Sequence, residues 1–246
     1  MKRLLFAVAL MGTFLSSCGD DEVVLDPSTI GEAYYPLEVG TYKIFNVAVT
    51  TYEDNEVKEE VAFQERELVN QMYKDQAGKD WYRVEISRRQ TSSDPWQVSG
   101  VRSISREFID KTSGNLVIQE NNRKRIHMVF PVVEGKSWNA YGFDYDYNKD
   151  DGKQYYSFIN VNQPFKVGEK VFDNSVRLVI QDFNGISGNS EIYEILSLNE
   201  GPVYRYTKQL NYCSDSQGIQ CPYNEEYIIN GTERIEELES SGKIDL

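Results

Sequence analysis

Residues 175–183 read Ser-Val-Arg-Leu-Val-Ile-Gln-Asp-Phe, and this stretch decides the fold class. Val176, Leu178 and Ile180 share one parity and oppose the polar residues Ser175, Arg177 and Gln181. Residues 81–89, Trp-Tyr-Arg-Val-Glu-Ile-Ser-Arg-Arg, repeat the pattern. Successive side chains of a β-strand point to opposite faces, so both stretches predict strands with one dry and one wet face. Such alternation is typical of antiparallel strands over a single core.

Similar runs of Tyr, Phe, Val, Ile and Thr, broken by Gly, Asn and Asp, continue along the chain in both directions. The predicted strands cover residues 42–52, 81–89, 98–108, 115–119, 125–130, 138–147, 155–161, 175–183, 190–198, 203–210 and 225–236. Residues 56–73 fit both a helical and a strand spacing, and we expect a strand because both neighbours are strands. We therefore predict an all-β fold, an antiparallel meander of about 10 to 12 strands that forms a barrel or a curled half-barrel.

The N-terminus has the order of features found in export signals. Lys2 and Arg3 precede an apolar run over residues 4–14, which is shorter than the roughly 20 residues that a membrane-spanning helix needs. The next residues, Leu-Ser-Ser-Cys at 15–18, resemble the bacterial lipobox. We expect residues 1–17 to be a lipoprotein signal peptide and Cys18 to carry acyl chains that anchor the protein in a membrane. The alternatives are a buried first helix or an ordinary secretory signal.

Residues 18–33 are polar and are expected to form an acidic tether, followed by a single β domain over residues 34–246. The cluster Gly-Asp-Asp-Glu at 19–22 resembles the signal that exports Bacteroidetes-type lipoproteins to the cell surface. A solvated acidic tether explains the composition equally well. We expect an outer-membrane lipoprotein that faces the exterior.

The net charge of −13 argues against nucleic acid as a partner, because binding to phosphates requires basic side chains. Of the three cysteines, Cys213 and Cys221 stand close together in a polar segment of an exported chain. This spacing predicts a disulfide that closes a short loop. A redox or metal site is the alternative, although the chain contains a single histidine.

Two segments share a pattern of an aromatic residue, proline, glycine and a second aromatic residue. They are residues 35–42, Tyr-Pro-Leu-Glu-Val-Gly-Thr-Tyr, and residues 130–138, Phe-Pro-Val-Val-Glu-Gly-Lys-Ser-Trp. We expect the glycine to form a tight turn and the aromatic residues to cap the core. The first segment resembles the FPL-x-x-G-x-x-W-x-Y stretch of uncharacterised Bacteroidetes-type outer-membrane lipoproteins, although Lys43 replaces the usual Trp. The resemblance implies a fold and a compartment, and no catalytic residues.

Tests for reactive sites identify only weak candidates. Oxygen-bearing side chains alternate at Asp144, Asp146, Asn148 and Asp150, which suits a calcium loop, but the EF-hand glycine and glutamate are missing and a polar turn is expected. His127 lies in an apolar stretch without a hydrolase motif, and we expect it to be packed or at the surface. We expect no cofactor.

Aromatic residues are abundant, and they allow two interpretations. The tyrosines and tryptophans could form a platform on which a glycan or peptide stacks, or they could fill the core and cross-strand pairs. We expect the core. The function predicted from the sequence is a non-enzymatic, lipid-anchored binding or accessory module whose ligand is an unknown protein, glycan or lipid. The alternatives are a carrier or sensor of an apolar ligand, of the LolA and LolB type, and a surface glycan-acting hydrolase.

Overall fold

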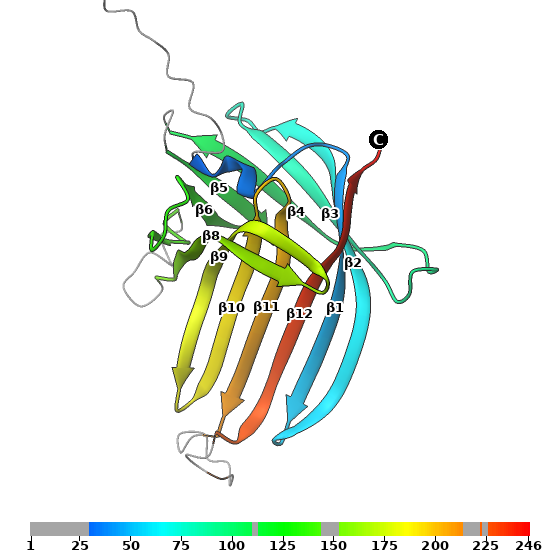
Figure 1. Ribbon diagram of the computed structural model, residues 1–246, viewed down its shortest axis with the longest axis vertical. Coiled ribbons are helices and arrows are strands. Elements are labelled where there is room, and N and C mark those ends of the chain that lie inside the picture. The colour runs from blue at the N-terminus through cyan, green and yellow to red at the C-terminus, as the bar shows by residue number, and fades with distance from the viewer. Residues whose placement is uncertain (1–29, 110–112, 144–152, 214–221, 223–225) are drawn as a thin grey trace, which may run out of the picture.

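The computed structural model describes residues 30–109, 113–143, 153–213, 222 and 226–246 (Figure 1). Within these residues a short 3-10 helix precedes twelve strands. The elements are η1 (Glu32–Tyr34), β1 (Thr41–Glu53), β2 (Glu56–Lys74), β3 (Asp80–Arg89), β4 (Gln97–Phe108), β5 (Gly114–Glu120), β6 (Arg123–Phe130), β7 (Ser137–Asn139), β8 (Tyr155–Val167), β9 (Lys170–Gly185), β10 (Gly188–Ser197), β11 (Gly201–Tyr212) and β12 (Ile228–Lys243). The predicted all-β fold is confirmed.

All twelve strands belong to one antiparallel sheet in the order β6-β5-β4-β3-β2-β1-β12-β11-β10-β9-β8-β7. The first and last strands pair in the middle, so β6 and β7 are the two edges. These edges meet, because the Ile126 backbone N–H donates to the Ala140 carbonyl at 2.7 Å. Trp138 Nε1 also donates to the Ile126 carbonyl at 2.9 Å. The sheet is a nearly closed barrel, as the meander predicts.

The ambiguous stretch over residues 56–73 is a strand, β2, as predicted. The predicted strand over residues 138–147 is wrong at residues 140–143, since β7 ends at Asn139, and residues 144–147 lie outside the described residues. At the end of β7 the Asn139 side chain accepts the Tyr141 backbone N–H, and the Asn139 carbonyl accepts that of Gly142. An asparagine side chain that bonds two residues ahead favours a turn over a continuing strand.

The alternation that predicted the fold is confirmed in β9 and for Tyr82 and Val84 of β3. Val176 and Leu178 are fully buried, and Ile180 packs against the same core. In β3, Val84 is buried and Tyr82 packs against the same core. The register shift beside Ile86 and Ser87 places an extra residue, Ser99, in the neighbouring strand β4. Bulges of this kind leave the sheet continuous and increase its bend.

Both proline-containing segments have the predicted turn. Gly40 and Gly135 have φ values of 90° and 73°, which only glycine adopts without strain. Tyr35 and Phe130 are buried before these turns, and Trp138 is buried after the second. The repeated pattern therefore marks two places where the chain enters the sheet over an aromatic cap.

Ordered structure reaches back into the expected tether. The Ile30 carbonyl accepts the Val132 backbone N–H, and the Ala33 carbonyl accepts that of Asn199. Glu32 forms an ion pair with Arg106 of β4. These contacts attach the last residues of the tether to the barrel.

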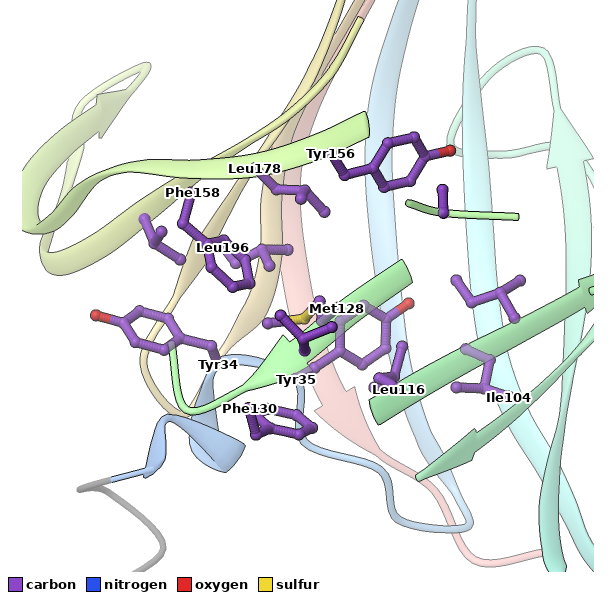
Figure 2. Close-up of a cluster of buried hydrophobic side chains, with 14 of the residues drawn as sticks. Tyr34, Tyr35, Ile104, Leu116, Met128, Phe130, Tyr156, Phe158, Leu178 and Leu196 are labelled. Carbon is purple, nitrogen blue, oxygen red and sulfur yellow. The ribbon is translucent and has the colours of Figure 1, made fainter. Parts of the chain in front are cut away.

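A large apolar cluster fills one end of the barrel (Figure 2). It collects side chains from η1 and from strands on both sides of the seam, including Tyr34, Tyr35, Ile104, Leu116, Met128, Phe130, Tyr156, Phe158, Leu178 and Leu196. The hairpin formed by β8 and β9 crosses the outer face of β10 to β12, shown in yellow-green in Figure 1. Phe165 of this hairpin packs against Tyr204, and Lys170 Nζ donates to the Glu239 carbonyl.

Candidate binding site on the outer face

Most site residues predicted from the sequence lie outside the described residues. These are the lipidation site Cys18, the weak metal candidates Asp144, Asp146, Asn148 and Asp150, and Cys221. Cys213 is buried at the end of β11. The lipid anchor, the disulfide and the metal loop therefore stay predictions.

The middle of the barrel interior contains charged side chains that pack beside apolar ones such as Phe45. Arg205 of β11 donates to Glu67 of β2 at 2.8 Å and to Glu236 of β12 at 2.9 Å. Arg102 of β4 lies 2.5 Å from the second Glu67 oxygen. Further pairs join Arg234 to Glu236 and Glu65, and Arg88 to Glu65. We name these residues, together with Glu194, the interior network.

The network contains four carboxylates, Glu65, Glu67, Glu194 and Glu236, and four guanidinium groups, those of Arg88, Arg102, Arg205 and Arg234. Burial alone would raise the pKa of Glu67, but the guanidinium groups of Arg102 and Arg205 hold it at about 2. Equal numbers of opposite charges in contact reduce the cost of removing them from water. The network therefore holds the barrel walls together with its charges balanced.

His127 of β6 extends the network across the barrel. Its Nε2 lies 3.3 Å from the Glu194 carboxylate of β10, and its ring packs edge-on against Tyr35. Burial lowers the pKa of His127, more than the nearby Glu194 carboxylate raises it. The imidazole is therefore neutral near pH 7, and Nε2–H donates to Glu194.

Little space is left beside this network. A cavity of about 30 Å³ lies between Lys43, Glu67, Tyr35 and Ile104. This volume holds one or two water molecules. At this position the barrel is filled by its own side chains.

The outer face of the sheet is different, because a row of directly opposed residues crosses six strands. Val179 pairs with Tyr193, Tyr193 with Tyr206, Tyr206 with Ile235, Ile235 with Ala48, and Ala48 with Ala62. Their neighbours along each strand, such as Leu178, Glu194, Arg205, Glu236 and Val47, face the interior. We name the row of Val179, Tyr193, Tyr206, Ile235, Ala48 and Ala62 the outer belt. With strands about 4.8 Å apart, it is roughly 24 Å long.

The outer belt is exposed at its β1–β2 end and partly exposed over β9 to β12, where Tyr193 packs against the cluster that contains Val167 and Ile195. Ala48 and Ala62 are exposed, and Tyr193, Tyr206 and Ile235 are partly exposed. Tyr193 also contacts Tyr204 and Tyr206, with ring centroids 6.0 and 5.2 Å apart. Aromatic rings packed against each other lose little freedom when a ligand covers them, which favours binding.

A groove of about 470 Å³ lies at the β2 end of the outer belt. Ala48, Ala62 and Ile235 line it, and the turn residues Gln90, Thr91 and Ser92 of the β3–β4 hairpin form one wall. Gln90 Nε2 fixes that wall by donating to the Ala62 carbonyl at 2.7 Å. The other lining residues include the polar residues Asn46, Gln64, Glu237 and Glu239 and the apolar residues Val47 and Phe63.

A smaller pocket of about 110 Å³ lies at the other end, where the β8–β9 register breaks. Asn160 and Asn162 have left-handed backbone angles there, with φ of 56° and 58°. The Glu134 carboxylate accepts the Asn160 backbone N–H, and Tyr34 donates to Asn162 at 2.6 Å. Strain held in place by such contacts is common at binding sites.

Arg177 and Tyr193 form a wall of this pocket. The Arg177 guanidinium lies 3.6 Å from the Tyr193 ring centroid and donates to Glu191 at 2.7 Å. The pocket therefore presents an aromatic ring, a guanidinium group and side-chain amides. Together the pocket, the outer belt and the groove form a continuous surface.

Sequence reasoning did not identify this surface, because it assigned the tyrosines to the core. The sequence does contain a pattern that indicates this surface. In residues 204–206, Tyr-Arg-Tyr, the side chains alternate between the two faces of β11, so that Arg205 faces the interior and both tyrosines face outward. Sequence reasoning did not identify the interior network either. Glu65 and Glu67 share the parity of Phe63 and Val69, which identifies them in retrospect as inward-facing.

Among the described residues, no group of three or more His, Cys, Asp or Glu side chains is arranged to hold a metal ion. The described part of the chain contains no helix that is both long and apolar enough to cross a bilayer. Comparison with known proteins found no matching family model, no matching curated protein and no matching solved structure.

Proposed function

We propose that this protein is a lipid-anchored outer-membrane lipoprotein that acts as a non-enzymatic binding module through its outer belt. The anchor is Cys18, and the protein faces the cell exterior. The single observation that supports a binding role is the row of opposed residues on the outer face, which has a hollow at each end. The inner face also has a hollow, of about 420 Å³, at its open end between Thr51, Gln209 and Thr232, but no row of aromatic side chains leads to it.

The carrier alternative requires a deep apolar cavity, since an apolar ligand must be sheltered from water. At the position of Lys43 and Glu67 the interior offers about 30 Å³ beside paired charges. A surface hydrolase requires two carboxylates across a cleft. In the outer groove Glu237 and Glu239 project from the same strand. Neither alternative is favoured by a specific observation.

The anchor is tested by the Cys18→Ser variant. If Cys18 carries the acyl chains, this variant leaves the membrane fraction of the producing cells, whereas the wild type sediments with it. Protease added to intact cells then reports the side of the membrane. A variant that stays in the membrane fraction would show that another segment anchors the chain.

Binding is tested by the Ala48→Arg variant, which places a long charged side chain in the groove at the β2 end of the outer belt. Gln209→Arg is the matched control, because Gln209 is exposed on the opposite face of β11. Each variant, with Cys18→Ser, is incubated with envelopes from cells that lack the protein. We expect Ala48→Arg to reduce binding at least about tenfold relative to Gln209→Arg. Equal binding would exclude the outer belt.

A further inference from the structure

Carboxylates border the outer belt on both sides. One cross-strand row consists of Asp182, Glu191, Lys208, Glu233, Thr50 and Glu60, each opposite the next in the register. It contains four acidic residues and one basic residue. On the other side of the belt, Glu237 and Glu239 are exposed at the groove. The belt is therefore an apolar strip between two acidic borders.

Some of these carboxylates are held in place by the belt itself. Tyr206 donates to one Glu233 oxygen at 2.7 Å, and Tyr52 donates to the other at 3.2 Å. Glu239 accepts the Gln64 side chain at 2.7 Å. Asp182 and Glu60 are exposed. A cation that docks here meets charges that are already oriented, which reduces the entropic cost of binding.

We propose that the occupant of the outer belt is a basic polypeptide segment that carries apolar side chains; this inference rests on the proposed function of the belt. Its apolar side chains cover Tyr193, Tyr206 and Ile235, and its Lys or Arg side chains reach the bordering carboxylates. The belt length of roughly 24 Å corresponds to about seven residues of an extended chain. The net charge of −13 assists the approach of such a partner.

Fluorescence anisotropy with labelled probe peptides tests this inference on the mature chain carrying Cys18→Ser. The probe is the decapeptide (Lys-Leu)5, and the comparison peptides are (Glu-Leu)5 and (Lys-Gly)5. We expect only (Lys-Leu)5 to bind well, because it alone combines both features. Binding should weaken as NaCl increases, since the bordering charges are at the surface.

Charge reversal distinguishes a specific site from general attraction to an acidic protein. The double variant Glu60→Lys, Asp182→Lys reverses the charge at both ends of the acidic border, where both side chains are exposed. The control double variant, Glu56→Lys with Glu169→Lys, makes the same change at exposed positions outside the belt. We expect the first to weaken (Lys-Leu)5 binding about tenfold or more and the control to change it by less than about twofold.

Equal weakening by both double variants would overturn the inference. So would the absence of (Lys-Leu)5 binding, or binding of neutral cellopentaose that Tyr206→Ala abolishes, which would identify an oligosaccharide surface instead. If Ala48→Arg still reduces envelope binding in any of these cases, the proposed function survives and only the nature of its ligand is wrong.

Discussion

Arg205 and Glu67 contact each other across the barrel interior, with Arg205 Nη1 2.8 Å from Glu67 Oε1, although β11 and β2 are not neighbours in the sheet. Arg102 of β4 reaches the same carboxylate from the other side. These contacts exist only because the sheet curls. The interior network therefore links distant strands of the barrel.

Replacing Glu67 by Gln tests the structural role of the network. The amide keeps the shape of the side chain but leaves Arg205 and Arg102 with one carboxylate fewer. Breaking a buried ion pair on one side costs about 3–5 kcal/mol of unfolding free energy. Guanidinium denaturation followed by circular dichroism measures the loss. The exposed control Glu60→Gln should change stability by less than about 0.5 kcal/mol; similar values for both would contradict the role of the network.

The stability of the protein should also depend on pH through Glu67. Its pKa of about 2 in the folded protein lies below the ordinary value of 4.5. The folded state therefore binds fewer protons than the unfolded state, and the contribution is complete above about pH 5 and is lost as pH falls toward about 2. Urea denaturation midpoints measured across this range should decline more steeply for the wild type than for Glu67→Gln. Parallel curves would show that another group causes the decline.

His127 offers a direct spectroscopic test, since it is the only histidine in the chain. Burial lowers its pKa below the ordinary 6.5. In a nitrogen-detected NMR titration of the folded protein, the imidazole should stay neutral below pH 6.5, with the proton on Nε2. Protonation at lower pH should destabilise the fold, because the unfolded state accepts the proton more readily. A titration midpoint above 6.5 would show that Glu194 dominates over burial.

The predicted disulfide between Cys213 and Cys221 can be checked by alkylation. The mature Cys18→Ser chain should show no free thiol until it is reduced. Removing the bond with Cys221→Ser should lower the unfolding free energy by about 2–3 kcal/mol, the amount expected for a short closed loop. Two thiols that react without reduction would contradict the prediction.

The sequence predicted the strands well because their alternation is local. The boundaries of β1, β3 and β4 differ from the predicted ones by a residue at most. β12 begins three residues after its predicted start and extends seven residues beyond its predicted end at Glu236, since its last residues pair with β1 through Ser240 and Lys243. Such pairing depends on a distant strand, so periodicity along β12 alone does not reveal it.

The candidate site could not be predicted in the same way. The outer belt exists only when Tyr193, Tyr206, Ile235 and Ala48 are placed side by side by the register of their strands. Register depends on bulges, such as the shift between Ile192 and Tyr193. No local sequence pattern predicts the position of such a bulge. The sequence therefore predicted which residues form strands, but not which of them share a row.

Photocrosslinking in living cells tests most directly whether the outer belt is the binding surface. A photoreactive phenylalanine analogue replaces Ala48 or Ala62 in the groove, and Gln209 on the opposite face as the control. We predict a discrete crosslinked product, abolished by Tyr206→Ala, at the two belt positions and none at Gln209. Products at Gln209 without products at Ala48 and Ala62 would contradict the account and transfer the binding function to the other face of the sheet.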